Sequence, residues 1–220
     1  MIFGIKQEAF EKLFKFMLEG SVVTGKLFFF TLLIALPLGL ILSLGRMSKL
    51  YILNIPIRLY LLIMRGTPLI LQLFFFYFGP YYVFEKSFDR FTAAVLAMGL
   101  NYAAYFAEIY RSGIQSMPKG QYAAAEVLGF SKQQTFLKII LPQVIKRILP
   151  PMGNEFMTLV KDTALVTAIG VAEIYQVATD NMSRMGSIVP LVMAGVFYLV
   201  MNSVVSKAVN IAEKKLSYYR

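Results

Sequence analysis

Three polar residues late in the sequence have the spacing of one helix face. Glu155, Thr158 and Asp162 are spaced i, i+3 and i+7, so an α-helix presents them on one side. A similar stripe lies earlier in the chain and contains Met98, Asn101, Tyr105 and Glu108. Carboxylates bind cationic groups, whereas amides and hydroxyls orient polar ligands. Two such faces predict a cavity for a small polar solute. Glu155, with Asp162 on the same face, supplies the negative charge. Asn101, Tyr102 and Thr158 are expected to orient the solute, and Met98 to pack against its apolar part.

The segments that carry these residues are strongly apolar. Of the 220 residues, 58% are hydrophobic and only 15% are charged. Uncharged runs cover residues 27–45, 66–84 and 185–206. Crossing the hydrocarbon of a bilayer takes about 20 residues of helix, so these runs predict membrane spans. The polar stripes therefore belong to an integral membrane protein.

We expect an all-α fold with five spans in a single domain that covers residues 1–220. A fourth run, 91–107, becomes long enough if Glu108 faces protein, and the Pro-rich segment 139–171 is counted as a buried, charged span. The spans are placed near 22–46, 56–80, 88–111, 143–167 and 187–209. Residues 1–20 carry six charges without an apolar core region, so they are an amphipathic N-terminal segment rather than a signal peptide.

Charge and composition narrow orientation and chemistry. Lys and Arg are more frequent in the loops that are cytoplasmic if the N-terminus is outside and the C-terminus inside, which is the expected orientation. The sequence has no Cys and no His, so the commonest metal ligand, general base and thiolate nucleophile are missing. Its net charge of +10 is scattered among apolar runs, without the basic stripe of a nucleic-acid-binding protein.

Charged residues inside a membrane are costly and persist when they face protein, water or a ligand. Glu155 either contacts the solute or pairs with Arg65. Arg65 itself either binds a solute carboxylate or ties the sequence Gly66-Thr67-Pro68, where Gly and Pro are expected to break helix hydrogen bonding locally. Lys161 either pairs with Asp162 as an outer gate or contacts the solute. Glu108 is interpreted as a structural partner of Arg111, three residues on. The aromatic run 74–78 is expected to be packing or lipid-facing surface.

The longest hydrophilic loop, residues 112–141, is predicted to be cytoplasmic and structured. Pro118 suits a first helical turn, and Gly129 is placed to end that helix in a left-handed conformation. Ser131 and Gln134 match a capping box that starts the next helix. The run of Ala123, Ala124 and Ala125 offers a small-residue surface to a partner. An ordinary connection between two spans is the alternative.

At this loop the sequence resembles the permease subunits of ATP-driven (ABC) importers. Their pattern of Glu-Ala-Ala, three residues, Gly and a later Ile-x-Leu-Pro corresponds to residues 123–129 and 139–142, with Ala123 in the acidic first position. Further matches over nearly the whole chain point to the polar amino acid family, and to its basic amino acid permeases for arginine, lysine and histidine. They lie at residues 65–69, 101–105, 107–113, 118–121, 141–143 and 161–163.

The resemblance implies the type I permease fold with a short cytoplasmic coupling helix. It also implies import of polar, and more narrowly basic, amino acids across the cell membrane by alternating access. It implies two ATP-binding subunits, a second permease subunit as in a homodimer, and an extracytoplasmic amino-acid-binding protein. ATP hydrolysis is expected in the separate subunit, because this chain has no phosphate-binding loop; no cofactor or metal is expected. The residues implied to dock the ATPase are Gly120, Ala123, Ala124, Ala125, Glu126 and Gly129.

Two other classes of protein remain as alternatives. A self-contained channel or ion-coupled carrier would use the intramembrane acids as cation sites, but five spans without an evident inverted repeat argue against it. An intramembrane enzyme is disfavoured by the missing His and Cys. The acidic interior fits arginine, lysine or histidine, whereas glutamine would not need it.

Overall fold

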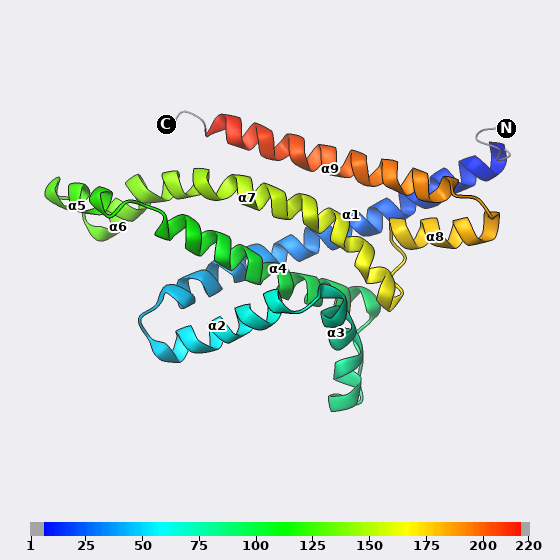
Figure 1. Ribbon diagram of the computed structural model, residues 1–220, viewed down its shortest axis with the longest axis horizontal. Coiled ribbons are helices and arrows are strands. Elements are labelled where there is room, and N and C mark those ends of the chain that lie inside the picture. The colour runs from blue at the N-terminus through cyan, green and yellow to red at the C-terminus, as the bar shows by residue number, and fades with distance from the viewer. Residues whose placement is uncertain (1–6, 217–220) are drawn as a thin grey trace.

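The computed structural model describes residues 7–216, and every regular element in that range is helical. The long helices α1, α4, α7 and α9 run roughly along the molecule, and α3 stands out from it (Figure 1). The element bounds are α1 Gln7–Met47, α2 Tyr51–Gly66, α3 Leu69–Phe84, α4 Arg90–Gln115, α5 Lys119–Val127, α6 Lys132–Gln134, the π-helix η1 Thr135–Ile140, α7 Leu141–Asp162, the 3₁₀-helix η2 Thr163–Ile169, α8 Ile174–Met185 and α9 Val189–Lys215.

The first helix is longer than expected. The predicted N-terminal segment 1–20 is continuous with the first span from Gln7 onward, while its residues 1–6 lie outside the described part of the chain. Buried residues recur every three or four positions from Leu13 to Ser43, which gives α1 one inward face along its whole length. The lead-in and the span therefore form a single rod of 41 residues.

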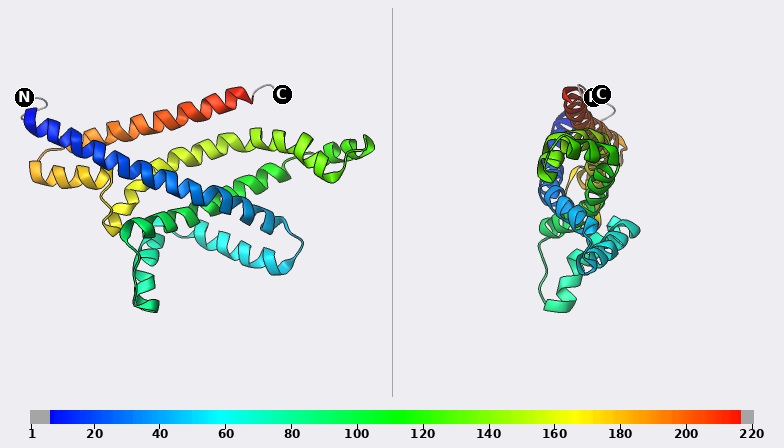
Figure 2. Two further views of the ribbon diagram at one scale, coloured as in Figure 1. Left: turned by 180° about the vertical axis from the view of Figure 1, so that it is seen from behind. Right: turned by 90° about the vertical axis from the view of Figure 1, so that its left-hand side faces the viewer.

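Small residues make α4 the centre of the bundle. Its buried positions include six alanines. A Cβ atom added at Gly39 of α1 would lie 2.9 Å from Phe106 Cβ and 3.0 Å from the carbonyl oxygen of Ala103, so the two helices approach closely at this point. From behind, α1 crosses over α4 and α7 (Figure 2). The six alanines are Ala93, Ala94, Ala97, Ala103, Ala104 and Ala107.

The predicted span 56–80 is broken. Residues before and after Thr67 and Pro68 form two helices, α2 and α3, whose axes are bent by 110°. Proline has no N–H to continue the helix ladder, and Thr67 has an extended backbone. The expected disruption of helix hydrogen bonding at Gly66-Thr67-Pro68 therefore takes the form of a sharp turn.

Two helices, α1 and α9, are long and apolar enough to cross a membrane, and the bent pair α2 and α3 is a third if it is counted as one span. The other two predicted spans correspond to α4 and to α7 with η2. The polar residues Asn101, Tyr105 and Glu108 lower the hydropathy of α4, and α7 carries charged and proline residues. The count of five spans stays a prediction.

The two ends of the molecule carry different connections. The link between α1 and α2, the short helices α5 and α6, and the end of α9 lie at one end (Figure 1). The start of α1, the helix α8 and the connection from η2 to α8 lie toward the other end. The loop predicted to be cytoplasmic therefore shares an end with the first interhelical connection and the end of α9.

Candidate functional site

The predicted polar stripes meet where α4 packs against α7. The Tyr102 hydroxyl of α4 donates a 2.7 Å hydrogen bond to Asp162 Oδ2 at the end of α7. Met98 and Tyr102 are buried, whereas Thr158 is exposed. The structure thus joins Tyr102 to Asp162 and leaves Thr158 on the open side of α7.

Glu155 is half-buried on α7 and has no hydrogen bond or salt bridge within residues 7–216. The charged side chains that act on it are Asp162, seven residues further along the same face, and Arg65 of α2. The hypothesis of a direct pair with Arg65 finds no such salt bridge in the described chain. Glu155 is therefore a carboxylate without a hydrogen-bonding or ion-pair partner in the described chain, two helical turns from a second acid on the same face.

The side-chain amide of Asn101 is hydrogen-bonded to groups of the chain itself. Its amide nitrogen donates to the Met64 carbonyl oxygen at 2.9 Å and to Gln72 Oε1 at 3.0 Å. The Gln72 amide in turn donates to Met64 O at 3.0 Å and to Thr67 Oγ1 at 2.8 Å. These bonds satisfy carbonyl groups that the break between α2 and α3 leaves free.

Gln72 was not among the predicted site residues. It is nearly buried, and it lies in an otherwise apolar stretch of the run 66–84. An isolated amide in a lipid-spanning run signals a buried hydrogen-bond network, and that signal was available in the sequence.

The expected outer pair of Lys161 and Asp162 is not a salt bridge in the described structure. Lys161 is exposed, and Asp162 accepts its hydrogen bond from Tyr102 instead. The two residues are neighbours in sequence, so their side chains point about 100° apart on the helix. The charge of Lys161 still acts on Asp162 through space.

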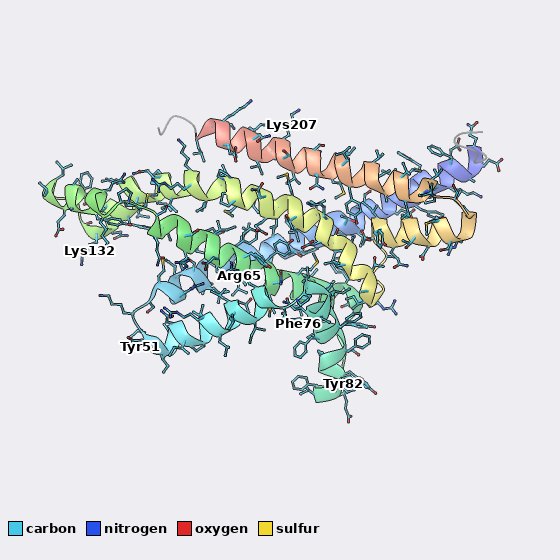
Figure 3. All side chains as sticks on the ribbon, in the orientation of Figure 1. Tyr51, Arg65, Phe76, Tyr82, Lys132 and Lys207 are labelled. Atoms are coloured by element: carbon cyan, nitrogen blue, oxygen red, sulfur yellow. The ribbon has the colours of Figure 1, made fainter. Side chains whose placement is uncertain are left out.

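Glu108 is the centre of an ion-pair cluster. Its carboxylate lies 2.5 Å from Arg111 Nη2, the predicted partner, and 2.5 Å from Arg46 Nη1 of α1. Arg65 Nη1 lies 3.8 Å away, and its guanidinium carbon is 5.7 Å from the centre of the Tyr105 ring. In Figure 3 the Arg65 label lies where α2 approaches α4.

A fully buried carboxylate, Glu173, is missing from the predicted set. It caps the start of α8 by accepting from the backbone N–H groups of Tyr175 at 2.7 Å and Gln176 at 3.1 Å. The hydroxyls of Thr24 and Thr167 donate at 3.3 Å, and the Tyr198 hydroxyl donates as well. The acidic residue just before a helix was a visible N-cap signal. Its partners on α1 and α9 are distant in sequence.

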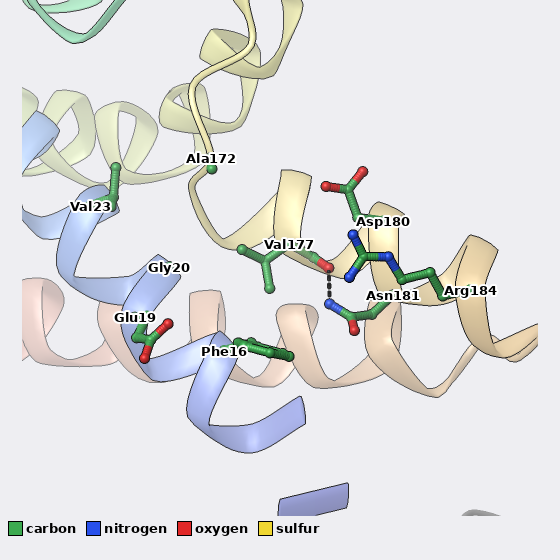
Figure 4. A pocket seen from close by; sticks show the side chains of 9 residues that line it. All are labelled: Phe16, Glu19, Gly20, Val23, Ala172, Val177, Asp180, Asn181 and Arg184. Atoms are coloured by element: carbon green, nitrogen blue, oxygen red, sulfur yellow. Dashed lines mark hydrogen bonds between the residues drawn. The ribbon is translucent and has the colours of Figure 1, made fainter. Parts of the chain in front are cut away.

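A small cavity of about 250 Å³ lies near Glu173, between the start of α1 and α8 (Figure 4). It is lined by Phe16, Glu19 and Arg184 among others, and it contains none of the predicted solute-binding residues. The amide of Asn181 on its wall donates to the Val177 carbonyl oxygen at 2.8 Å. Within residues 7–216, no cluster of acidic side chains has the arrangement of a metal site.

The loop between α4 and α7 has the predicted local structure. Gly129 is left-handed at φ 79°, and the Phe130 and Gly129 N–H groups donate to the carbonyl oxygens of Ala125 and Glu126, as in a Schellman motif. Ser131 and Gln134 form the predicted capping box. Pro118 precedes the first helical turn rather than lying in it.

The predicted docking residues differ in their exposure. Gly120, Ala123, Ala124, Glu126 and Gly129 are exposed, but Ala125 is only 1% exposed because it faces the packed side of α5. The three alanines are therefore divided between two faces. The large apolar side chains of Val127 and Leu128 are 88% and 73% exposed at the end of α5. The sequence prediction did not include them.

Comparison with known proteins identifies the family. The family model described as "Binding-protein-dependent transport system inner membrane component" matches residues 35–218. Among curated proteins of Bacillus subtilis (strain 168), the chain is 39% identical to "Probable amino-acid ABC transporter permease protein YckA", covering 94% of this chain and 91% of the relative. It is 37% identical to "Arginine transport system permease protein ArtQ", covering 91% and 92%.

A solved structure agrees with this result. A chain from "Crystal structure of an amino acid ABC transporter with histidines" matches with a TM-score of 0.87 and 33% identity, covering 96% of this chain and 99% of that one. The described helices thus have the arrangement of a permease in an ABC transporter. The chain therefore belongs to the family of inner membrane components of binding-protein-dependent transport systems.

Proposed function

We propose that this chain is the permease subunit of an ATP-driven importer that carries polar, and specifically basic, amino acids across the inner membrane. The observation that carries the proposal is the half-buried, unpartnered Glu155 beside Asp162. A buried charge is costly without a counterion, so such a pair of acids favours a cationic ligand. One acid would meet the α-ammonium group and the other the charged side chain of a basic amino acid.

The family membership supports this solute class. Its relatives include proteins named for arginine, glutamine and L-cystine transport. The local chemistry favours a basic solute: an uncharged side chain has no use for a second carboxylate, whereas the two cationic groups of arginine or lysine would neutralise both. Glu155, Asp162 and Tyr102 would bind the solute, with Met98 as apolar packing and Thr158 as the hydroxyl on the open side of α7.

The proposed assembly follows the organisation of binding-protein-dependent transporters. Two copies of this chain, each with five spans, would pair around the path; two ATP-binding subunits would bind α5, and an extracytoplasmic protein would deliver the amino acid. The N-terminus would be outside and the C-terminus inside. The exposed apolar end of α5, at Val127 and Leu128, supports a docking role, because water-exposed apolar groups of this size mark contact surfaces.

The test is amino acid uptake by the reconstituted transporter carrying Glu155→Gln, which keeps the size of the side chain and removes its charge. Uptake of arginine and lysine should fall about 10- to 100-fold, the range for a lost charge-assisted contact. Glu85→Gln is the matched control, because Glu85 is exposed at the end of α3. Unchanged arginine and lysine uptake by Glu155→Gln would contradict the assignment. Uptake in liposomes that lack the ATP-binding subunits would favour a self-contained carrier.

A further inference from the structure

The acidic site lacks free hydrogen-bond donors. A zwitterionic amino acid brings a carboxylate as well as an ammonium group, and a carboxylate in a protein interior needs donors. The Tyr102 hydroxyl already donates to Asp162, and the Asn101 amide donates to Met64 and Gln72. Of the proposed solute-binding residues, only Thr158 retains a donor without an assigned partner. The acidic site thus offers acceptors for the cationic groups of the amino acid but too few donors for its carboxylate.

Donors are abundant in an adjacent cavity. A hollow of about 620 Å³ lies against α2 and is lined by three arginines and by Leu61, Leu62 and Gly66. The arginines are Arg46, Arg58 and Arg65. No acidic residue lines this cavity. Apart from Glu108, which lies behind Arg46 and Arg65, the charged groups at this cavity are thus opposite in sign to Glu155 and Asp162.

The three guanidinium groups differ in how far they are already used. Arg46 is paired at 2.5 Å with Glu108, which also holds Arg111. Arg65 has only the long 3.8 Å contact with Glu108 and the Tyr105 ring at 5.7 Å. Arg58 is exposed and has no hydrogen bond or salt bridge within the described residues. Arg58 and Arg65 lie on the same face of α2, two turns apart. Both therefore retain free donors.

Arg65 is also connected to the acidic site through two aromatic rings of α4. Its guanidinium carbon lies 5.7 Å from the centre of the Tyr105 ring, and that ring lies 6.1 Å from the ring of Tyr102, whose hydroxyl donates to Asp162. The ring of Tyr105 limits where the Arg65 guanidinium can go, and Glu108 draws it from the other side. A guanidinium held in this way presents a planar pair of donors that matches a carboxylate.

We infer that Arg65, assisted by Arg58, binds the α-carboxylate of the transported amino acid while Glu155 and Asp162 bind its cationic groups. This inference rests on the proposed function and adds the orientation of the bound amino acid. The carboxylate lies toward α2 and the ammonium toward α7. An amine that lacks the carboxylate cannot use Arg65 and is discriminated against at this point.

The experiment compares amino acids with their decarboxylated amines. Binding of arginine and agmatine, and of glutamine and 4-aminobutanamide, is measured on the assembled transporter without the extracytoplasmic binding protein, so that only the permease discriminates. In the wild type, the amino acid of at least one pair should bind more tightly than its amine. Arg65→Gln should weaken that amino acid about 10- to 100-fold and leave the amine within about twofold. Arg58→Gln should also weaken binding of the amino acid relative to its amine, but by a smaller factor.

Three controls separate a carboxylate contact from a general loss of structure. Arg65→Lys keeps the charge and should restore part of the discrimination. Arg184→Gln removes an exposed arginine at the opposite end of the chain and should change nothing. Melting temperatures report whether each variant folds.

Several outcomes would overturn the inference. Equal weakening of amino acid and amine by Arg65→Gln would make Arg65 a structural residue. If Lys161→Gln lost the discrimination instead, the carboxylate would lie beside Lys161 at the end of α7 rather than beside Arg65. Equal binding of amine and amino acid by the wild type would exclude a carboxylate site. Failure of the proposed function has a different signature, since Glu155→Gln would then leave uptake unchanged whatever Arg65 does.

Discussion

Glu173 and Glu155 are two carboxylates in the same bundle with opposite surroundings. Glu173 is 0% exposed and accepts hydrogen bonds from two backbone N–H groups and from three hydroxyls. Glu155 is less buried and accepts none within the described residues. Burial alone therefore does not mark a binding site in this membrane protein. The difference lies in whether the chain itself supplies the donors.

The comparison predicts its largest effect on stability at Glu173. Glu173→Leu removes the cap of α8 and takes the acceptor from two backbone N–H groups of α8 and from the half-buried hydroxyls of Thr167 and Tyr198. The free energy of unfolding should fall by about 3 kcal/mol, because several buried polar groups lose their partner at once. The measurement is thermal unfolding of the purified protein in detergent. A melting temperature equal to that of the wild type would break the comparison.

Glu155 should show the reverse pattern. Glu155→Gln removes a charge that no described residue satisfies, so the melting temperature should stay the same or rise while arginine uptake falls. The informative quantity is the ratio of the two effects, measured on the same preparation. A melting temperature that falls as far as that of Glu173→Leu would make Glu155 a structural carboxylate.

The network at the helix break should give an intermediate effect. Asn101→Ala and Gln72→Ala each leave the carbonyl oxygen of Met64 with one donor fewer, and each should cost about 1 to 2 kcal/mol. The two changes remove parts of one network, so the double variant should cost less than their sum. Strict additivity in thermal unfolding would show that the two amides act independently.

The smallest expected effect concerns the loop between α4 and α7. Gly129→Ala places a Cβ on a left-handed residue with no neighbour within 4 Å, so only backbone strain of about 1 kcal/mol results. Gly186→Ala is a matched control, because Gly186 is also left-handed with open space, but at the end of α8. Gly129→Ala alone should lower the ATP hydrolysis that loaded binding protein stimulates. Equal loss in both variants would remove the docking role of α5.

Local features of this fold could be predicted from the sequence because local chemistry determines them. The left-handed Gly129, the capping box at Ser131 and the pairing of Glu108 with Arg111 each depend on residues a few positions apart. The resemblance to ABC importer permeases likewise rested on short motifs, and the family match confirms it.

Long-range partners could not be predicted in the same way. A local break at Gly66-Thr67-Pro68 could be predicted, but the 110° bend between α2 and α3 could not, since hydropathy does not record direction. Asn101 was assigned to the solute because its amide partner, Gln72, is 29 positions away in sequence. The cap at Glu173 had a local signal, but its full burial could not be predicted because the hydroxyls of Thr24 and Tyr198 come from helices that lie far apart along the chain. In each case the deciding fact was which distant group meets the polar atom.

The length of α1 has a mechanical consequence. A helix of 41 residues is about 60 Å long, roughly twice the thickness of the hydrocarbon core. It touches α8 at Gly20, where an added Cβ would lie 3.1 Å from Ile174 Cα, and it holds Glu108 through Arg46 near its other end. Pro37 is the one proline within it. We expect α1 to act as a lever, so that a displacement at the Arg46 end reaches α8 as a swing of the whole rod, with Pro37 as its weakest joint.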